Sequence, residues 1–286
     1  MGLISGLVPV NMADQKAMWL ASAPRYDYNP QFVYGREFSQ KTLTKYGFPE
    51  EGLVELAKKI LEELPSNFFP KQIASQEPFL SKEQIISEVG EWVKKLKLPE
   101  LTVGFDENQV NRVMLLENKL SLRWPLKIDR RQLERILTHE ITGHYQRSYN
   151  HWRHFGVWLK NLTPERRMTE EGLAQYLADH SSGENNQWSL ALAALKYYLT
   201  YLALSKSFAE VFEVAYSYLQ DIERSWTYTF RSKRGIEDTS RGGGFTKDLV
   251  YFEGYLAVDK WIKEHPDDWQ KIFYGKLSLA EIEKFT

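Results

Sequence analysis

Cysteine is absent from the 286-residue sequence, and its absence narrows the chemistry open to the chain. Without cysteine there are no disulfide bonds, no cysteine nucleophile and no thiolate ligands, so any metal site has to be built from histidine, aspartate and glutamate. A chain without disulfides fits a reducing compartment, and we predict that the protein is cytoplasmic.

A strong excess of charge of either sign is also lacking. Lysine and arginine number 37, aspartate and glutamate 38, and the formal net charge is −1. This balance argues against binding to nucleic acid or to an acidic membrane through bulk charge. No apolar run approaches the roughly 18 residues needed to cross a bilayer. We therefore predict neither nucleic acid nor a membrane as a partner.

The pattern of apolar residues predicts an α+β fold that is mostly helical. With 43% hydrophobic residues the chain can bury a sizeable core. Periodicity and capping signals predict helices over about 52–64, 81–97 and 130–147, strands over 101–105, 112–116 and 120–124, and mainly helix from 164 onward. A small sheet thus lies next to the central helix. No linker is evident, so we predict a single domain, 1–286, with a mainly helical N-terminal part over about 1–100 and a catalytic part over 101–286.

The central predicted helix contains the sequence His139-Glu140-Ile141-Thr142-Gly143-His144. Two imidazoles that flank a glutamate suggest a zinc site with Glu140 as the base. The familiar spacing is His-Glu-x-x-His, which separates the imidazoles by about 40° around an α-helix, whereas the spacing of five here separates them by about 140°. A wider π-type turn would return both to one face, and Gly143 would tolerate it best. The alternative is an ordinary helix with two surface histidines.

A zinc peptidase needs a third protein ligand and an open position for water. Glu170 and Glu171 begin the next acidic helix. Glu170 shares a face with Leu173 and would point to the core, whereas Glu171 shares a face with Ala174 and Ala178, which would allow a close approach to the metal helix. We favour Glu171 as the ligand. Glu170, or two solvated carboxylates near a helix N-terminus, are the alternatives.

These motifs resemble the tubulin tyrosine/glutamate metallocarboxypeptidases, whose bacterial relatives are labelled flavohaemoglobin expression-modulating QEGLA motif proteins. The resemblance rests on His-Glu-x-x-x-His, on Glu-Gly-Leu-Ala at 171–174 with Glu170 where those proteins carry glutamine, and on segments 29–34, 207–212, 234–235 and 243–251. It covers about residues 25 to 275. It implies a zincin-like fold, one Zn²⁺ per chain, Glu171 as the matching ligand, and removal of a C-terminal residue, with tyrosine the best-known leaving residue. Tubulin as a substrate follows from the resemblance alone.

A basic stretch over 231–251 surrounds the glycine run 242–244. A carboxypeptidase has to hold a free C-terminal carboxylate, and arginine does this best through two parallel hydrogen bonds. We predict Arg234 and Arg241, then Lys247, as substrate-binding residues, and Tyr251 as a hydroxyl donor to the oxyanion. The alternatives are a flexible surface loop with solvated charges and a packed aromatic side chain.

Taken together, the residues predict a zinc metallocarboxypeptidase that acts on a peptide or protein C-terminal tail. His139, His144 and Glu171 would hold the metal, and Glu140 would take a proton from water and pass it to the leaving amine. The strand over 120–124 would pair with the substrate backbone. The rival interpretations are an endo- or aminopeptidase on the same zinc site and a non-enzymatic regulatory or binding protein of this fold.

Overall fold

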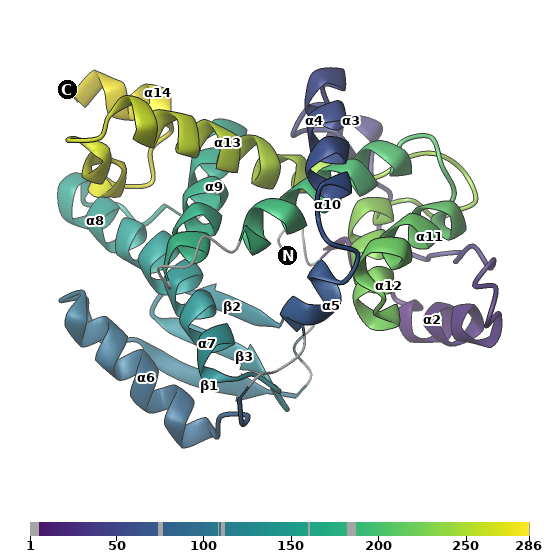
Figure 1. Cartoon of the computed structure of the whole chain (residues 1–286), viewed down its shortest axis with the longest axis horizontal. Helices are drawn as coiled ribbons and strands as arrows, with labels where there is room; N and C mark the ends of the chain where they lie inside the picture. The colour runs from purple at the N-terminus through teal and green to yellow at the C-terminus, as the bar shows by residue number, and fades with distance from the viewer. Residues whose placement is uncertain are drawn as a thin grey trace. The chain divides into compact units, whose positions relative to one another are not determined.

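The computed structural model describes residues 6–73, 77–107, 109, 112–159, 161–181 and 187–285 (Figure 1). The chain divides into two compact units, each made of two segments that are distant in sequence. The first unit comprises Met1–Ile73 and Ala191–Phe252, and the second comprises Ala74–Leu190 and Glu253–Thr286. Residues 74–100 thus belong to the same unit as the sheet. The sequence had placed them in the N-terminal part, which was predicted to end near residue 100. The single domain stays a prediction.

The first unit is helical among its described residues. Its helices are α2 (Met12–Ala21), α3 (Gln40–Leu43), α4 (Glu51–Glu62), α5 (Phe68–Ile73), α11 (Phe208–Leu219), α12 (Ile222–Lys233), the 3-10 turn η2 (Thr246–Asp248) and most of α10 (Trp188–Ala203). An aromatic core that includes Trp19, Phe208 and Trp226 joins the N-terminal segment to α11 and α12. The ring centroids of Trp19 and Trp226 are 4.6 Å apart. Aromatic side chains bury a large apolar area each, so this cluster stabilises the unit.

The second unit contains a three-stranded sheet in the order β1-β3-β2. The strands are β1 (Thr102–Asp106), β2 (Val113–Leu116) and β3 (Lys119–Arg123), with β1 parallel and β2 antiparallel to β3. All three lie within one residue of their predicted positions. Because β3 is paired on both sides, the prediction that it binds the substrate backbone is wrong. The strands at the two edges of this sheet are β1 and β2.

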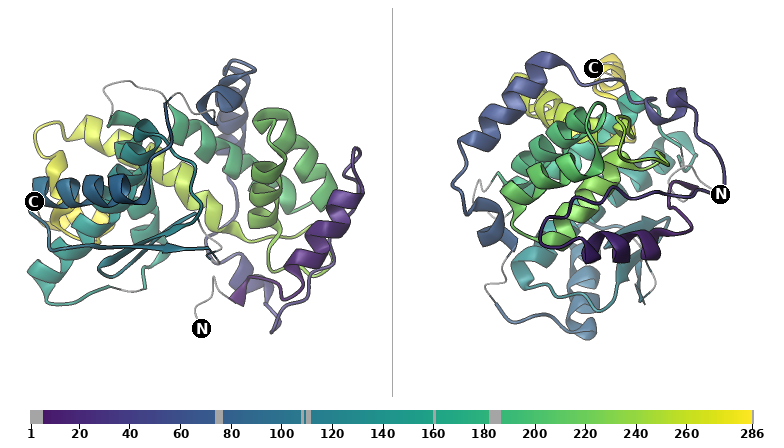
Figure 2. Two further views of the ribbon diagram at one scale, coloured as in Figure 1. Left: turned by 90° about the horizontal axis from the view of Figure 1, so that it is seen from below. Right: turned by 90° about the vertical axis from the view of Figure 1, so that its right-hand side faces the viewer.

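The other regular elements described in the second unit are helices. They are α6 (Lys82–Lys95), α7 (Arg130–Leu137), the π-helix η1 (Thr138–Tyr145), α8 (Gln146–Phe155), α9 (Pro164–His180), most of α13 (Leu249–Glu264), η3 (Trp269–Tyr274), α14 (Leu279–Ile282) and η4 (Glu283–Phe285). Apolar side chains of α6 and α7 form one core with Leu120 and Leu122 of the sheet. Figure 2 shows the ribbon from two further directions. The predicted α+β fold, mostly helical with a small sheet, is confirmed. No helix among the described residues is long and apolar enough to cross a membrane.

Capping boxes define where α6 and α7 begin. The side chain of Ser81 accepts from the backbone N–H of Gln84, and that of Asp129 accepts from the backbone N–H of Gln132. In return, the side-chain oxygen of each glutamine accepts from the backbone N–H of Ser81 or Asp129. Each box satisfies backbone donors that a helix start leaves open. The second box fixes the start of a helical run that continues through η1 and α8 to Gly156, whose φ of +71° ends it. The run is therefore longer than the predicted 130–147.

Candidate metal centre

The motif His139–His144 lies in a π-helix that spans Thr138–Tyr145 between α7 and α8. A π-helix is wound more widely than an α-helix, with i→i+5 hydrogen bonds, so side chains five apart lie near the same face. The two imidazoles accordingly approach each other, with 3.3 Å between His139 Nε2 and His144 Nε2. The wider turn predicted from the spacing is confirmed, and it removes the geometric objection to a shared ligand.

Glu171 of α9 completes a group of three side chains that could hold a metal ion. One ligand atom from each of His139, His144 and Glu171 lies within 4.8 Å of the others. Glu171 Oε2 is 4.0 Å from His139 Nε2 and 3.7 Å from His144 Nε2. Ligands at about 2.0–2.2 Å on a tetrahedral zinc ion are about 3.3–3.5 Å apart. The observed separations fit such an ion with small adjustments, and three ligands leave its fourth position open.

Small residues allow α9 to approach the π-helix this closely. A Cβ atom built on Gly143 would lie 2.6 Å from the Cβ of Ala174, which is one turn after Glu171. On its other side α9 contacts α13, where a Cβ on Gly172 would lie 2.2 Å from the backbone of Gly254. Tight contacts of this kind exclude larger side chains. Ala174, whose small side chain was expected to allow a close approach of the two helices, thus lies in contact with the π-helix.

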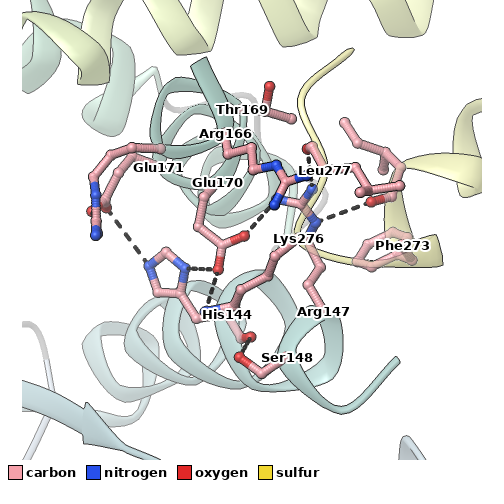
Figure 3. Close-up of polar contacts among 12 residues, drawn as sticks. His144, Arg147, Ser148, Arg166, Thr169, Glu170, Glu171, Phe273, Lys276 and Leu277 are labelled. Carbon is pink, nitrogen blue, oxygen red and sulfur yellow. Dashed lines mark hydrogen bonds and ion pairs between the residues drawn. The ribbon is translucent and has the colours of Figure 1, made fainter. Parts of the chain in front are cut away.

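Glu170 does not belong to the group of three but is bound to one of its members. Its Oε1 is 3.0 Å from His144 Nδ1 and 3.1 Å from Lys276 Nζ, and its Oε2 is 2.5 Å from Arg147 Nη1 (Figure 3). Burial would raise the pKa of Glu170, but Lys276, Arg147 and His144 outweigh it and hold that pKa well below its usual range. A carboxylate in this position accepts the Nδ1 proton of His144, which leaves Nε2 to face Glu171.

Arg147 links this part of α8 to the C-terminal segment. It is fully buried, and besides Glu170 it donates to the carbonyl oxygens of Ile272 and Leu277 at 3.0 and 2.8 Å. Sequence reasoning missed both Arg147 and Lys276. Their partners lie far along the chain, so no local motif could have indicated them.

A cleft of about 680 Å³ in the second unit contains Glu140 together with His144 and Glu171. Glu140 is half-buried there. Leu115 and Leu116 of β2 and the segment with Trp158, Leu159 and Leu162 provide apolar walls, and Lys119, Arg167 and Lys276 provide the cations. The cleft thus combines a carboxylate, candidate ligands and an apolar surface.

Much of the charge in the basic stretch 231–251, in the first unit, stabilises the loop itself. Arg231 donates twice to Asp248, at 2.9 and 2.6 Å. Lys233 donates to the carbonyl oxygens of Ala203, Lys206 and Arg241, at 3.3, 2.7 and 2.5 Å, while burial lowers its pKa to about 8. The loop is therefore held by specific bonds.

The four side chains predicted to bind substrate lie in this same unit. Arg241 is exposed and pairs with Asp238 at 3.0 Å, whereas Arg234 is buried, and burial lowers its pKa to about 10. Lys247 Nζ lies 3.4 Å from the hydroxyl of Tyr251, which is itself buried. Their roles in substrate binding stay predictions.

Comparison with known proteins connects the chain to one family. The family described as microtubule-associated tyrosine carboxypeptidase matches residues 33–286. Microtubule-associated tyrosine carboxypeptidase 1 of Mus musculus is 32% identical over 294 residues, 99% of this chain and 62% of that protein. The proteins of the same name from Rattus norvegicus and Homo sapiens are 33% identical over 298 residues (99% and 61%) and 32% over 267 (90% and 56%). The chain spans about three fifths of the length of these relatives.

Proposed function

The chain belongs to the microtubule-associated tyrosine carboxypeptidase family, as its motifs indicated, and from this premise we propose that it is a zinc-dependent carboxypeptidase. It would remove a C-terminal residue, tyrosine by preference, from a peptide or protein tail. The observation that carries this proposal is the group His139, His144 and Glu171, whose ligand atoms lie within 4.8 Å of one another, with His144 and Glu171 in the same cleft as Glu140. We also propose that the second unit has a zincin-like fold.

The donor set is suited to zinc because it offers two imidazole nitrogens and one carboxylate oxygen at compatible separations. A zinc ion held there would supply a Lewis acid that polarises the scissile carbonyl and makes water acidic near neutral pH. Glu140 is the general base: it takes a proton from the attacking water and then passes it to the leaving amine. Glu170 holds His144 in the orientation that this arrangement needs.

The cleft walls support an aromatic leaving residue. Leu115, Leu116, Trp158 and Leu162 present apolar surface next to the proposed ligands. Apolar walls with a few polar groups are typical of sites that select a side chain. The relatives are named for tyrosine and for microtubules, so a tubulin tail is the first protein substrate we propose, with the cytoplasm as the location.

A peptide that ends in a free tyrosine tests the activity. Mass spectrometry should show the loss of that single residue by the zinc-loaded chain, and a loss at least about a hundredfold slower by the Glu140→Gln variant. Cleavage inside the peptide would favour an endopeptidase, and release of the first residue an aminopeptidase. A zinc-loaded chain that binds the peptide but never cleaves it would favour the non-enzymatic interpretation and contradict the proposal.

A further inference from the structure

Among the described residues, three cations line the cleft of the proposed metal site, and they differ in the contacts that their side chains make. Lys276 is bound to Glu170 at 3.1 Å, and Lys119 is exposed at the start of β3. Arg167 lies on α9 one helical turn before Glu171, with Nη1 3.6 Å from Glu171 Oε1. Its Nε is buried and has no hydrogen-bond partner within the described part of the chain. A buried donor without a partner requires an explanation, and a ligand is one.

The length of one residue places a requirement on any carboxypeptidase. The terminal carboxylate lies one residue beyond the scissile carbonyl, and one residue spans at most about 3.3–3.6 Å. The group that holds the carboxylate therefore has to lie close to the metal ligands. Arg167 meets this requirement, because it is adjacent to Glu171 and lines the same cleft as Glu140.

The charge of Arg167 is only loosely compensated. Its 3.6 Å contact with Glu171 is an ion pair longer than a hydrogen bond, and about a quarter of its side chain is exposed. Once Glu171 binds a metal ion through Oε2, its negative charge is shared with that ion, which weakens its attraction for Arg167. A planar guanidinium with unused donors is suited to bind a carboxylate through two parallel bonds.

We propose that Arg167 binds the terminal carboxylate of the substrate and so restricts cleavage to the last peptide bond. This inference rests on the proposed function. The residue proposed to bind the carboxylate therefore lies on the same helix as the candidate ligand Glu171. The basic loop offers the rival candidates Arg234, Arg241 and Lys247. A substrate with a free C-terminus is thus selected by a side chain of the second unit.

Equilibrium binding tests the inference without turnover. A fluorescent peptide ending in free tyrosine, and its C-terminal amide, are titrated by anisotropy against the zinc-loaded Glu140→Gln chain, which should not cleave them. The free acid should bind ten- to a hundredfold more tightly, as expected for a hydrogen bond to a charged group. Adding Arg167→Gln should reduce binding of the acid to the level of the amide and leave the amide unchanged. Arg167→Lys, which keeps the charge but loses the planar fork, should be intermediate.

Lys119→Gln is the matched control, because it removes one positive charge from the same cleft and should keep the ratio of acid to amide. Zinc content and circular dichroism confirm that each variant is loaded and folded. A ratio that persists in zinc-loaded Arg167→Gln, or that disappears only in Arg241→Gln or Lys247→Gln, overturns the inference. Equal binding of acid and amide by the Glu140→Gln chain overturns it as well. Failure of the proposed function is distinguishable, since it appears as absent cleavage by the unmodified chain while the binding comparison still reports on Arg167.

Discussion

The candidate metal centre and the basic, glycine-rich loop both gather charged side chains, but the fold uses the two sets differently. In the metal centre, ligand atoms of His139, His144 and Glu171 converge within 4.8 Å beside a cleft. In the loop, Arg231 is bound to Asp248, and Lys233 donates to three carbonyl oxygens. Convergence on a common point indicates a site for a ligand, whereas a charge that already has good partners indicates stabilisation of the fold.

Loss of the general base should have the largest effect of the changes considered. Glu140→Gln should keep zinc and lower kcat by about 10²–10⁴-fold, because proton transfer by a positioned group contributes that much. In the loop, Arg241→Gln should change kcat/KM by less than threefold, since Arg241 is exposed and paired with Asp238. Steady-state cleavage of the tyrosine peptide measures both. A tenfold loss in Arg241→Gln would instead assign substrate binding to the loop.

Each region contains a buried carboxylate, Glu170 in the metal centre and Asp248 in the loop. Removing each one shows whether zinc affinity changes together with the free energy of unfolding or independently of it. Glu170→Ala leaves Arg147 and Lys276 without their partner and should lower the free energy of unfolding by about 3–5 kcal/mol. It should also weaken zinc binding about ten- to a hundredfold, because His144 loses its acceptor. Asp248→Ala should destabilise the fold but leave zinc affinity unchanged.

Denaturant titration and chelator competition measure these two quantities. Glu170→Gln, which keeps an acceptor for His144, should recover part of the zinc affinity that Glu170→Ala loses. If Asp248→Ala weakened zinc binding as much as Glu170→Ala, the distinction between the two regions would be wrong.

Close backbone contacts should respond to one added methyl group. Gly143→Ala places a Cβ 2.6 Å from Ala174, and overpacking of this kind costs about 1–3 kcal/mol of stability. Gly244→Ala in the loop meets the carbonyl oxygen of Ser232 and should destabilise similarly. Only Gly143→Ala should also weaken zinc binding. The control is Gly90→Ala on α6, which meets open space and should stabilise by about 0.5–1 kcal/mol.

The smallest expected effect is a pH dependence near the C-terminus. Arg166 donates to Glu281 at 2.9 and 2.6 Å and lowers the pKa of Glu281 to about 2. Because the unfolded carboxyl has a pKa of about 4.3, this pair stabilises the fold above that pH and ceases to do so as the pH falls towards 2. The stability difference between the unmodified chain and Arg166→Gln should be about 0.2–1 kcal/mol at pH 7 and should shrink between pH 5 and 3. Zinc-free protein is used, so that metal release does not contribute. A difference that stays constant with pH would contradict the assignment.

Features encoded by neighbouring residues could be predicted from the sequence. The five-residue spacing of His139 and His144, with Gly143 between them, predicted the π-helix, and Ser81 and Asp129 as N-cap residues predicted two helix starts. The three strands were predicted within one residue. Each of these signals lies within about one or two turns of backbone, where hydrogen bonding and side-chain spacing decide the structure.

Features that depend on distant residues could not be predicted. The sequence indicated the three strands but not their order, so β3 was expected at an edge of the sheet, whereas the structure has it between β1 and β2. Glu170 was expected in the core and is buried there, but its partners Arg147 and Lys276 come from other elements and were not foreseen. In the loop, the same basic composition fits binding or stabilisation, and only the positions of Asp248 and the carbonyl oxygens show which one Arg231 and Lys233 serve.

Zinc content tests the central claim most directly. Elemental analysis of the purified chain should find about one zinc per chain, and the same for Glu140→Gln, because Glu140 is a base and not a ligand. His139→Ala, His144→Ala and Glu171→Ala should each retain little zinc after dialysis while remaining folded by circular dichroism. Full zinc content in these three variants would contradict the account.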